Sequence, residues 1–200
     1  MQLVAATHNA HKLKEIDAIT APFGFTLIPK DDVGLAHIDV EETGATFEEN
    51  SYLKAAEICR LSGKPAIADE SGIEVDALNG APGVHSARFA GDHCNDEDNN
   101  RKLLQLLGDL PLEQRTGRFV SVVTLVFPDG KVLSARGEVE GHILFEKEGD
   151  GGFGYDPLFR PLGYDRSFGR FTAEEKNAIS HRGRALTALQ QKLQEEGFAL

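Results

Sequence analysis

Tryptophan is absent from this chain of 200 residues, and methionine and cysteine are scarce. The two cysteines, Cys59 and Cys94, form neither a CxxC pair nor a disulfide framework. No apolar run approaches the length of a membrane span. The N-terminal residues also lack the charged start and apolar stretch of a secretory signal. We therefore expect a cytoplasmic protein without a membrane partner.

Basic residues are also in deficit, because 21 Lys and Arg face 32 Asp and Glu, for a formal net charge of −11. This balance disfavours broad binding to nucleic acid, which needs a basic face. It leaves room for a small anionic ligand, since local Lys and Arg clusters can override the global sign. The GxxxxGK[ST], HExxH and GxSxG motifs are missing too, so Ser71 is better interpreted as a ligand contact than as a nucleophile.

The pattern of apolar residues predicts strands mixed with helices. Buried strands are expected at 3–6, 25–28, 66–68 and 119–127, and helices at 47–61, 96–107 and from 184 to about 196. Pro128-Asp129-Gly130 marks a turn after the longest strand, and residues 131–139 then return as a hairpin. The class is therefore α/β, and the hairpin argues against a purely parallel sheet.

The segment GGFGYDPLF, residues 151–159, is the most informative stretch of the chain. Glycine lets the backbone approach a ligand closely, while Phe153 and Tyr155 offer flat faces and Asp156 a fixed acceptor. Flat aromatic faces and a fixed hydrogen-bond acceptor would suit a nucleobase as ligand. Taken alone, such a run is more often a glycine-rich turn whose aromatic rings pack into a core.

Two further segments carry charge suited to phosphate. Residues 7–12, THNAHK, link a strand end to a helix start, where free N–H groups and the helix dipole favour an anion and Lys12 adds a charge. Residues 176–184 contain Lys176, His181, Arg182 and Arg184, which can bind phosphate or a carbonyl acceptor. The alternatives are a capped turn and a basic helix junction.

Four acids from two separate loops complete the set. Glu41 and Glu42 share one loop, and Asp69 and Glu70 are expected at the C-terminal end of a strand, where ligand sites of α/β proteins gather. Such carboxylates can bind Mg²⁺ together with substrate phosphates, and can accept a proton from a metal-bound water. The alternative for the paired glutamates is a solvated acidic surface.

Five segments in this order resemble the Ham1-like family of inosine and xanthosine triphosphate pyrophosphatases. They are ATHNAHK (6–12), EETGATFEENSYLKA (41–55), IADESGIEVDALNGAPGVHSARFAG (67–91), GGFGYDPLF (151–159) and EEKNAISHRGRAL (174–186). The resemblance implies a single Ham1-like domain over residues 1–200. It also implies an elongated mixed central sheet flanked by helices, and two lobes with an active-site cleft between them.

The resemblance further implies hydrolysis of inosine, deoxyinosine and xanthosine triphosphates to monophosphate and pyrophosphate, with Mg²⁺ as cofactor and a homodimer as assembly. It assigns metal binding to Glu41 and Glu70, and the proton acceptor to Glu70. It assigns substrate contacts to Thr7, His8, Asn9, Ala10, His11, Lys12, Ser71, Phe153, Gly154, Tyr155, Asp156, Lys176, His181 and Arg182.

One departure from the family pattern concerns the catalytic acid. This chain has Asp69-Glu70-Ser71 where related sequences usually have ADDSG. The carboxylate is longer by one methylene, and catalysis can be sensitive to shifts of ~1 Å. Glu70 is the favoured base, with Asp69 as the alternative. A nucleotide-binding protein without catalysis, or a related pyrophosphatase with a different base preference, are the competing functions.

Overall fold

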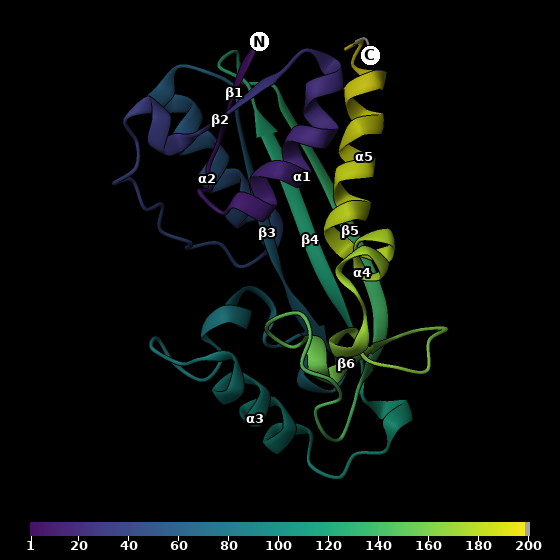
Figure 1. Cartoon of the computed structure of the whole chain (residues 1–200). Coiled ribbons are helices and arrows are strands. Elements are labelled where there is room, and N and C mark those ends of the chain that lie inside the picture. Colours follow the sequence, from purple (N-terminus) through teal and green to yellow (C-terminus); the bar gives the residue numbers. More distant parts are fainter. Residues whose placement is uncertain (199–200) are drawn as a thin grey trace. The chain divides into compact units, whose positions relative to one another are not determined.

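The computed structural model describes residues 1–198 and contains a six-stranded mixed sheet in the order β2-β1-β3-β4-β5-β6 (Figure 1). The strands are β1 (Gln2–Ala5), β2 (Thr26–Pro29), β3 (Ala66–Val75), β4 (Thr116–Val126), β5 (Val132–Ile143) and β6 (Phe159–Pro161). Strand β1 pairs in parallel with β2 and β3, whereas β5 and β6 are antiparallel. The predicted α/β class with a mixed sheet is confirmed.

Five α-helices accompany the sheet within the described residues. They are α1 (Ala10–Thr20), α2 (Phe47–Ser62), α3 (Asp96–Leu107), α4 (Ala173–Ile179) and α5 (His181–Glu195). Helix α3 has the predicted bounds, because Asn95 and Asp98 form a capping box at its start and Gly108 follows its end. Helix α5 begins earlier than predicted, since only Ser180 separates it from α4. In residues 1–198, no helix is both long and apolar enough to cross a bilayer.

The chain divides into two compact units. Unit 1 comprises residues 1–70, 121–137 and those from 182 onward, and unit 2 comprises residues 71–120 and 138–181. The boundary between them falls within β3, β4 and β5, so the same strands contribute to both units. The predicted single domain with two lobes and a cleft stays a prediction.

Unit 1 packs helices on both faces of its strands. Alternate residues of a strand point to opposite faces, so Leu3 of β1 packs in a core with Ile16 of α1 and Leu189 of α5, whereas Val4 packs with Ile58 of α2. Helices α1 and α5 therefore cover one face and α2 covers the other (Figure 1).

Unit 2 has an aromatic core of its own. Phe119 of β4 lies 4.7 Å from Phe159 and 5.9 Å from Phe168, measured between ring centroids. Leu103 and Leu107 of α3 belong to the same cluster, so α3 is anchored to this unit by its apolar face. The anchored helix bears on the site, because its first turn contacts the segment 151–159.

Strand β3 corrects one prediction. Asp69 and Glu70 were expected at a strand end, but β3 continues to Val75, with Ile73 and Val75 buried. The neighbouring strand β1 ends instead, because its last residue, Ala5, pairs with Ile67. Asp69 and Glu70 therefore lie just beyond the point on β3 where its pairing with β1 ends. After Ala5, the chain of β1 continues into residues 6–9, the turn that precedes α1.

Candidate active site

The turn after β1 is held by its own side chains. The Asn9 carboxamide oxygen accepts hydrogen bonds from the backbone N–H groups of His11 (3.0 Å) and Lys12 (3.2 Å), and Thr7 Oγ1 accepts from the N–H of Asn9 (3.1 Å). The prediction that these N–H groups are free is wrong for all three. The turn keeps residues 7–12 at least partly accessible, and their side chains are the groups that can meet an anion.

Asp69 forms ion pairs with two basic side chains from distant segments of unit 1. Its Oδ2 atom lies 2.9 Å from Lys12 Nζ and 3.6 Å from Arg182 Nε. Arg182 also binds Glu15 of α1 through Nη1 at 3.0 Å. Asp69 is 5% exposed, so it is a buried carboxylate committed to holding Lys12 and Arg182 together.

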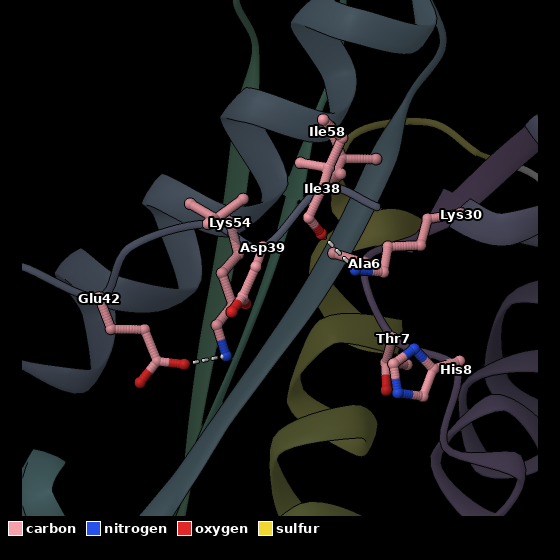
Figure 2. Close-up of a pocket in the computed structure, with 10 residues that line it drawn as sticks. Ala6, Thr7, His8, Lys30, Ile38, Asp39, Glu42, Lys54 and Ile58 are labelled. Carbon is pink, nitrogen blue, oxygen red and sulfur yellow. Dashed lines mark hydrogen bonds and ion pairs between the residues drawn. The ribbon is translucent and has the colours of Figure 1, made fainter. Parts of the chain in front are cut away.

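Glu70 and Glu42 converge on one ammonium group. Lys54 of α2 forms a short ion pair with Glu70 Oε1 and another, at 2.7 Å, with Glu42 Oε1. Figure 2 shows the Lys54 amine and the Glu42 carboxylate directed at each other. Two carboxylates from distant segments thus share a single cation.

The pKa of Glu70 is raised above its ordinary value. Burial is the main cause, and the charges of Glu42 and Asp69 add to it, while Lys54 opposes the rise without cancelling it. Burial also disfavours the charged form of Lys54, but the attraction of Glu70 and Glu42 outweighs burial and raises the pKa of the ammonium. A carboxylate with a raised pKa is a better proton acceptor near neutral pH.

A hollow of about 150 Å³ adjoins this cluster in unit 1 (Figure 2). Its lining includes Thr7 and His8 of the turn, Lys30, Glu42 and Lys54. Asp39 lines it as well, so the hollow combines the predicted anion-binding turn with two lysines and two carboxylates.

Glu41 lies elsewhere in unit 1. It lines a separate hollow together with Leu53, Glu57 and Arg60, whereas Glu42 lines the hollow beside the turn. The prediction of Glu41 as a metal ligand stays a prediction, and Glu42 is the acid that shares a cation with Glu70.

Two carboxylates are available to a metal ion in unit 1. Within residues 1–198, no cluster of three or more His, Cys, Asp or Glu is arranged to hold a metal. Glu42 and Glu70 nevertheless converge on one cation, and one or two carboxylates are enough to hold a divalent ion that takes its other ligands from substrate phosphates and waters.

In unit 2, Asp156 organises the segment 151–159. Its Oδ2 atom accepts from the N–H of Phe153 at 3.0 Å and from Lys176 Nζ at 2.6 Å. The Lys176 ammonium lies 4.5 Å from the centroid of the Phe153 ring. Phe153 is 67% exposed, so its ring is an open aromatic face beside a fixed cation.

Two other predicted contacts of unit 2 are largely buried. The Tyr155 ring belongs to the core, its hydroxyl donates to the carbonyl of Ser86 at 2.6 Å, and burial raises its pKa. His181 stacks on Phe119, with ring centroids 5.1 Å apart. Of the two aromatic rings predicted to shape the pocket, Phe153 is therefore the accessible one, whereas Tyr155 supports the loop from within.

The Ham1 family model matches residues 3–192 of this chain. The chain belongs to the Ham1 family. The dITP/XTP pyrophosphatase of Desulforamulus reducens is 47% identical over 186 residues, which cover 93% of this chain and 92% of that protein. The structure of the Staphylococcus aureus Ham1 protein matches with a TM-score of 0.92 and 39% identity, over 98% of this chain and 100% of that one. A Ham1 protein from Coxiella burnetii matches with a TM-score of 0.90 and 38% identity, over 98% of this chain and 99% of that one.

Sequence reasoning missed Lys54 in this Ham1 chain. The residue lies on α2, eight positions beyond the helix cap Thr46, and local pattern does not distinguish it from an ordinary helix-surface lysine. A signal was present, because Lys54 lies within the segment EETGATFEENSYLKA that carries the resemblance. That Lys54 pairs with both Glu42 and Glu70 can be seen only in the folded structure.

We expect Gly152→Ala to weaken substrate binding in this Ham1 protein. The φ angle of Gly152 is +71°, and an added Cβ would lie 2.1 Å from Asp156 Oδ2. Asp156 would have to move away from Lys176 and from the Phe153 N–H. Losing a charge-assisted contact of about 1.5–3 kcal/mol predicts a KM about tenfold higher or more in steady-state kinetics.

Gly163→Ala is the matched control for this prediction. Gly163 has a similar φ angle of +82°, and no atom lies within 4 Å of an added Cβ. It therefore introduces comparable backbone strain without touching Asp156. Equal KM values for the two variants would show that backbone strain, and not the displaced Asp156, is responsible.

Proposed function

We propose that this protein hydrolyses inosine, deoxyinosine and xanthosine triphosphates to the monophosphate and pyrophosphate, and so removes deaminated purines from the nucleotide pool. The observation that carries the proposal is the pair of buried carboxylates Asp69 and Glu70, each bound to a different lysine beside the turn 7–12. The printed names of relatives such as the Desulforamulus reducens dITP/XTP pyrophosphatase support the same substrates.

Glu70 is the proposed general base. Its raised pKa suits it to accept the proton of a water that attacks the triphosphate. Asp69 is less suited to that role, because its carboxylate is paired with two cations, Lys12 and Arg182, whereas Glu70 has one cation, which it shares with Glu42. We therefore assign Asp69 the role of positioning Lys12 and Arg182.

Glu42 and Glu70 are the residues that would hold Mg²⁺, with Glu41 as the acid implied by family resemblance. When bound, such an ion lowers the pKa of a coordinated water and screens phosphate charge. The Lys54 ammonium lies between these two carboxylates, so the pair already binds one positive charge.

The triphosphate is assigned to unit 1. Lys12, Lys54 and Arg182 supply positive charge, and preorganised cations of this kind stabilise the charge that develops on a leaving pyrophosphate. The proposed contacts of the turn are Thr7, His8, Asn9, Ala10, His11 and Lys12.

The purine is assigned to unit 2. The open ring of Phe153 can stack on a base, and the Lys176 ammonium beside it can donate to the carbonyl at position 6 of inosine or xanthosine. Adenine has an amino donor at that position, and an unpaired buried polar group costs about 1–3 kcal/mol, or roughly 10- to 100-fold in discrimination. Ser71, Gly154, Asp156 and His181 complete the proposed contacts of this unit, and Tyr155 is proposed to act indirectly, by supporting the segment 151–159 from the core.

A panel of nucleoside triphosphates with pyrophosphate detection tests the function. We expect Mg²⁺-dependent pyrophosphate release from inosine and xanthosine triphosphates at least about tenfold faster than from ATP. Comparable rates for all the common nucleotides would contradict the base preference. Binding without release would instead favour a nucleotide-binding protein. A cytoplasmic homodimer is the proposed state, and light scattering of the purified protein tests the dimer.

A further inference from the structure

The loop that carries Phe153 is held from a second direction by helix α3. The N–H of Gly154 donates to Asp96 Oδ2 at 2.8 Å, and the carbonyl of the same glycine accepts from Asn100 Nδ2 at 3.0 Å. Asp96 and Asn100 are four residues apart, so their side chains lie on the same face of the helix. The backbone N–H and the backbone carbonyl of Gly154 are therefore both hydrogen-bonded to side chains of α3.

The orientation of Asn100 is set by this contact. Asn100 is 3% exposed, and its amide group must donate to pair with the Gly154 carbonyl. Its Oδ1 atom has no hydrogen-bond partner among the described residues, so turning the amide over would place two acceptors against each other. The hydrogen bond to Gly154 is therefore the contact that fixes which way the Asn100 amide faces.

Helix α3 is a firm support for such a contact. Its start is closed by the capping box of Asn95 and Asp98, and its apolar face is buried through Leu103 and Leu107. The Phe153 backbone is thus fixed on both sides, by Asp156 at its own N–H and by α3 at the following residue. An exposed ring on a fixed backbone can stack on a ligand with a smaller ordering penalty, because the backbone is already in place.

We propose that Asp96 and Asn100 are positioning residues that clamp Gly154 and thereby hold Phe153 ready to stack on the purine. This inference deepens the proposed function and rests on it, because it assigns the clamp to substrate affinity. The groups assigned to the chemistry, Glu42, Lys54 and Glu70, belong to other segments. Loss of the clamp should therefore change KM much more than kcat.

Asp96→Ala is the direct test, and it changes an exposed residue. We expect faster amide hydrogen exchange in residues 152–156 and a KM for inosine triphosphate raised roughly three- to tenfold, the effect of one lost hydrogen bond. The kcat should stay within about twofold. Asn100→Asp, which keeps the shape and removes the donor, should change KM in the same direction.

Glu97→Ala is the matched control. It removes an acid from the same helical turn, together with an ion pair to Lys147, and it leaves the capping box intact. Among the described residues, no hydrogen bond joins the Glu97 side chain to Gly154. It should leave KM unchanged. Equal KM values for Asp96→Ala and Glu97→Ala, in an enzyme that hydrolyses inosine triphosphate, would overturn the clamp. Absence of pyrophosphate release by the unmodified protein would overturn the proposed function, and the inference with it.

Discussion

Glu70→Gln is expected to abolish most of the turnover of inosine triphosphate while nucleotide binding persists. Glutamine keeps the shape of the side chain and loses the ability to accept a proton. A general base contributes about 10²- to 10⁴-fold to rate, so kcat should fall by that factor. Stopped assays with pyrophosphate detection measure the rate, and titration calorimetry measures the affinity.

Glu74→Gln provides the control for this substitution. Glu74 lies on the same strand, β3, and also forms an ion pair, with Arg118 at 3.5 Å. Removing its charge should leave kcat unchanged. If Glu70→Gln retains turnover close to that of Glu74→Gln, Glu70 is not the base, and Asp69→Asn becomes the substitution to measure.

Lys54→Met is expected to change metal binding and turnover in opposite directions. Without nucleotide, the Glu42 and Glu70 carboxylates would lose the ammonium that they share, so their affinity for a divalent ion should rise. A unit charge about 4 Å away is worth several kcal/mol at most near a protein surface, which makes a gain of about tenfold or more reasonable. Mn²⁺ titration followed by electron paramagnetic resonance measures it directly.

Turnover of the same variant should fall about 10- to 100-fold, because a cation assigned to the triphosphate is missing. Lys14→Met is the control, since it removes one positive charge from an exposed position of α1. A similar gain in Mn²⁺ affinity for both variants would mean that net charge alone is responsible. An unchanged Mn²⁺ affinity in Lys54→Met would show that the two carboxylates do not form the metal site.

Local chemistry explains why much of the fold could be predicted. Helix α3 was predicted with its observed bounds because Asn95, Asp98 and Gly108 are capping signals within the segment itself. Helix α2 begins after Thr46 as expected, although the Glu49 carboxylate accepts from the N–H of Ala45 and not from that of Thr46. Signals of this kind act over a few residues and need no tertiary contact.

The candidate site was only partly predictable, because its contacts join residues distant in the sequence. Pattern alone could not distinguish Glu41 from Glu42, or identify Lys54 as the residue that both Glu42 and Glu70 contact. It could not decide that Tyr155 is buried while Phe153 is open, since both are aromatic residues of one glycine-rich segment.

Residue order alone determined the α/β class, the starts of α2 and α3 and the segments that carry the chemistry, because periodicity, caps and turn residues act between near neighbours in the chain. Only tertiary structure decided which lysine meets which carboxylate, which ring faces solvent and which helix holds Gly154. The physical reason is that burial and charge pairing depend on what the fold brings near a side chain, and these partners lie between 16 and 58 residues away in the chain.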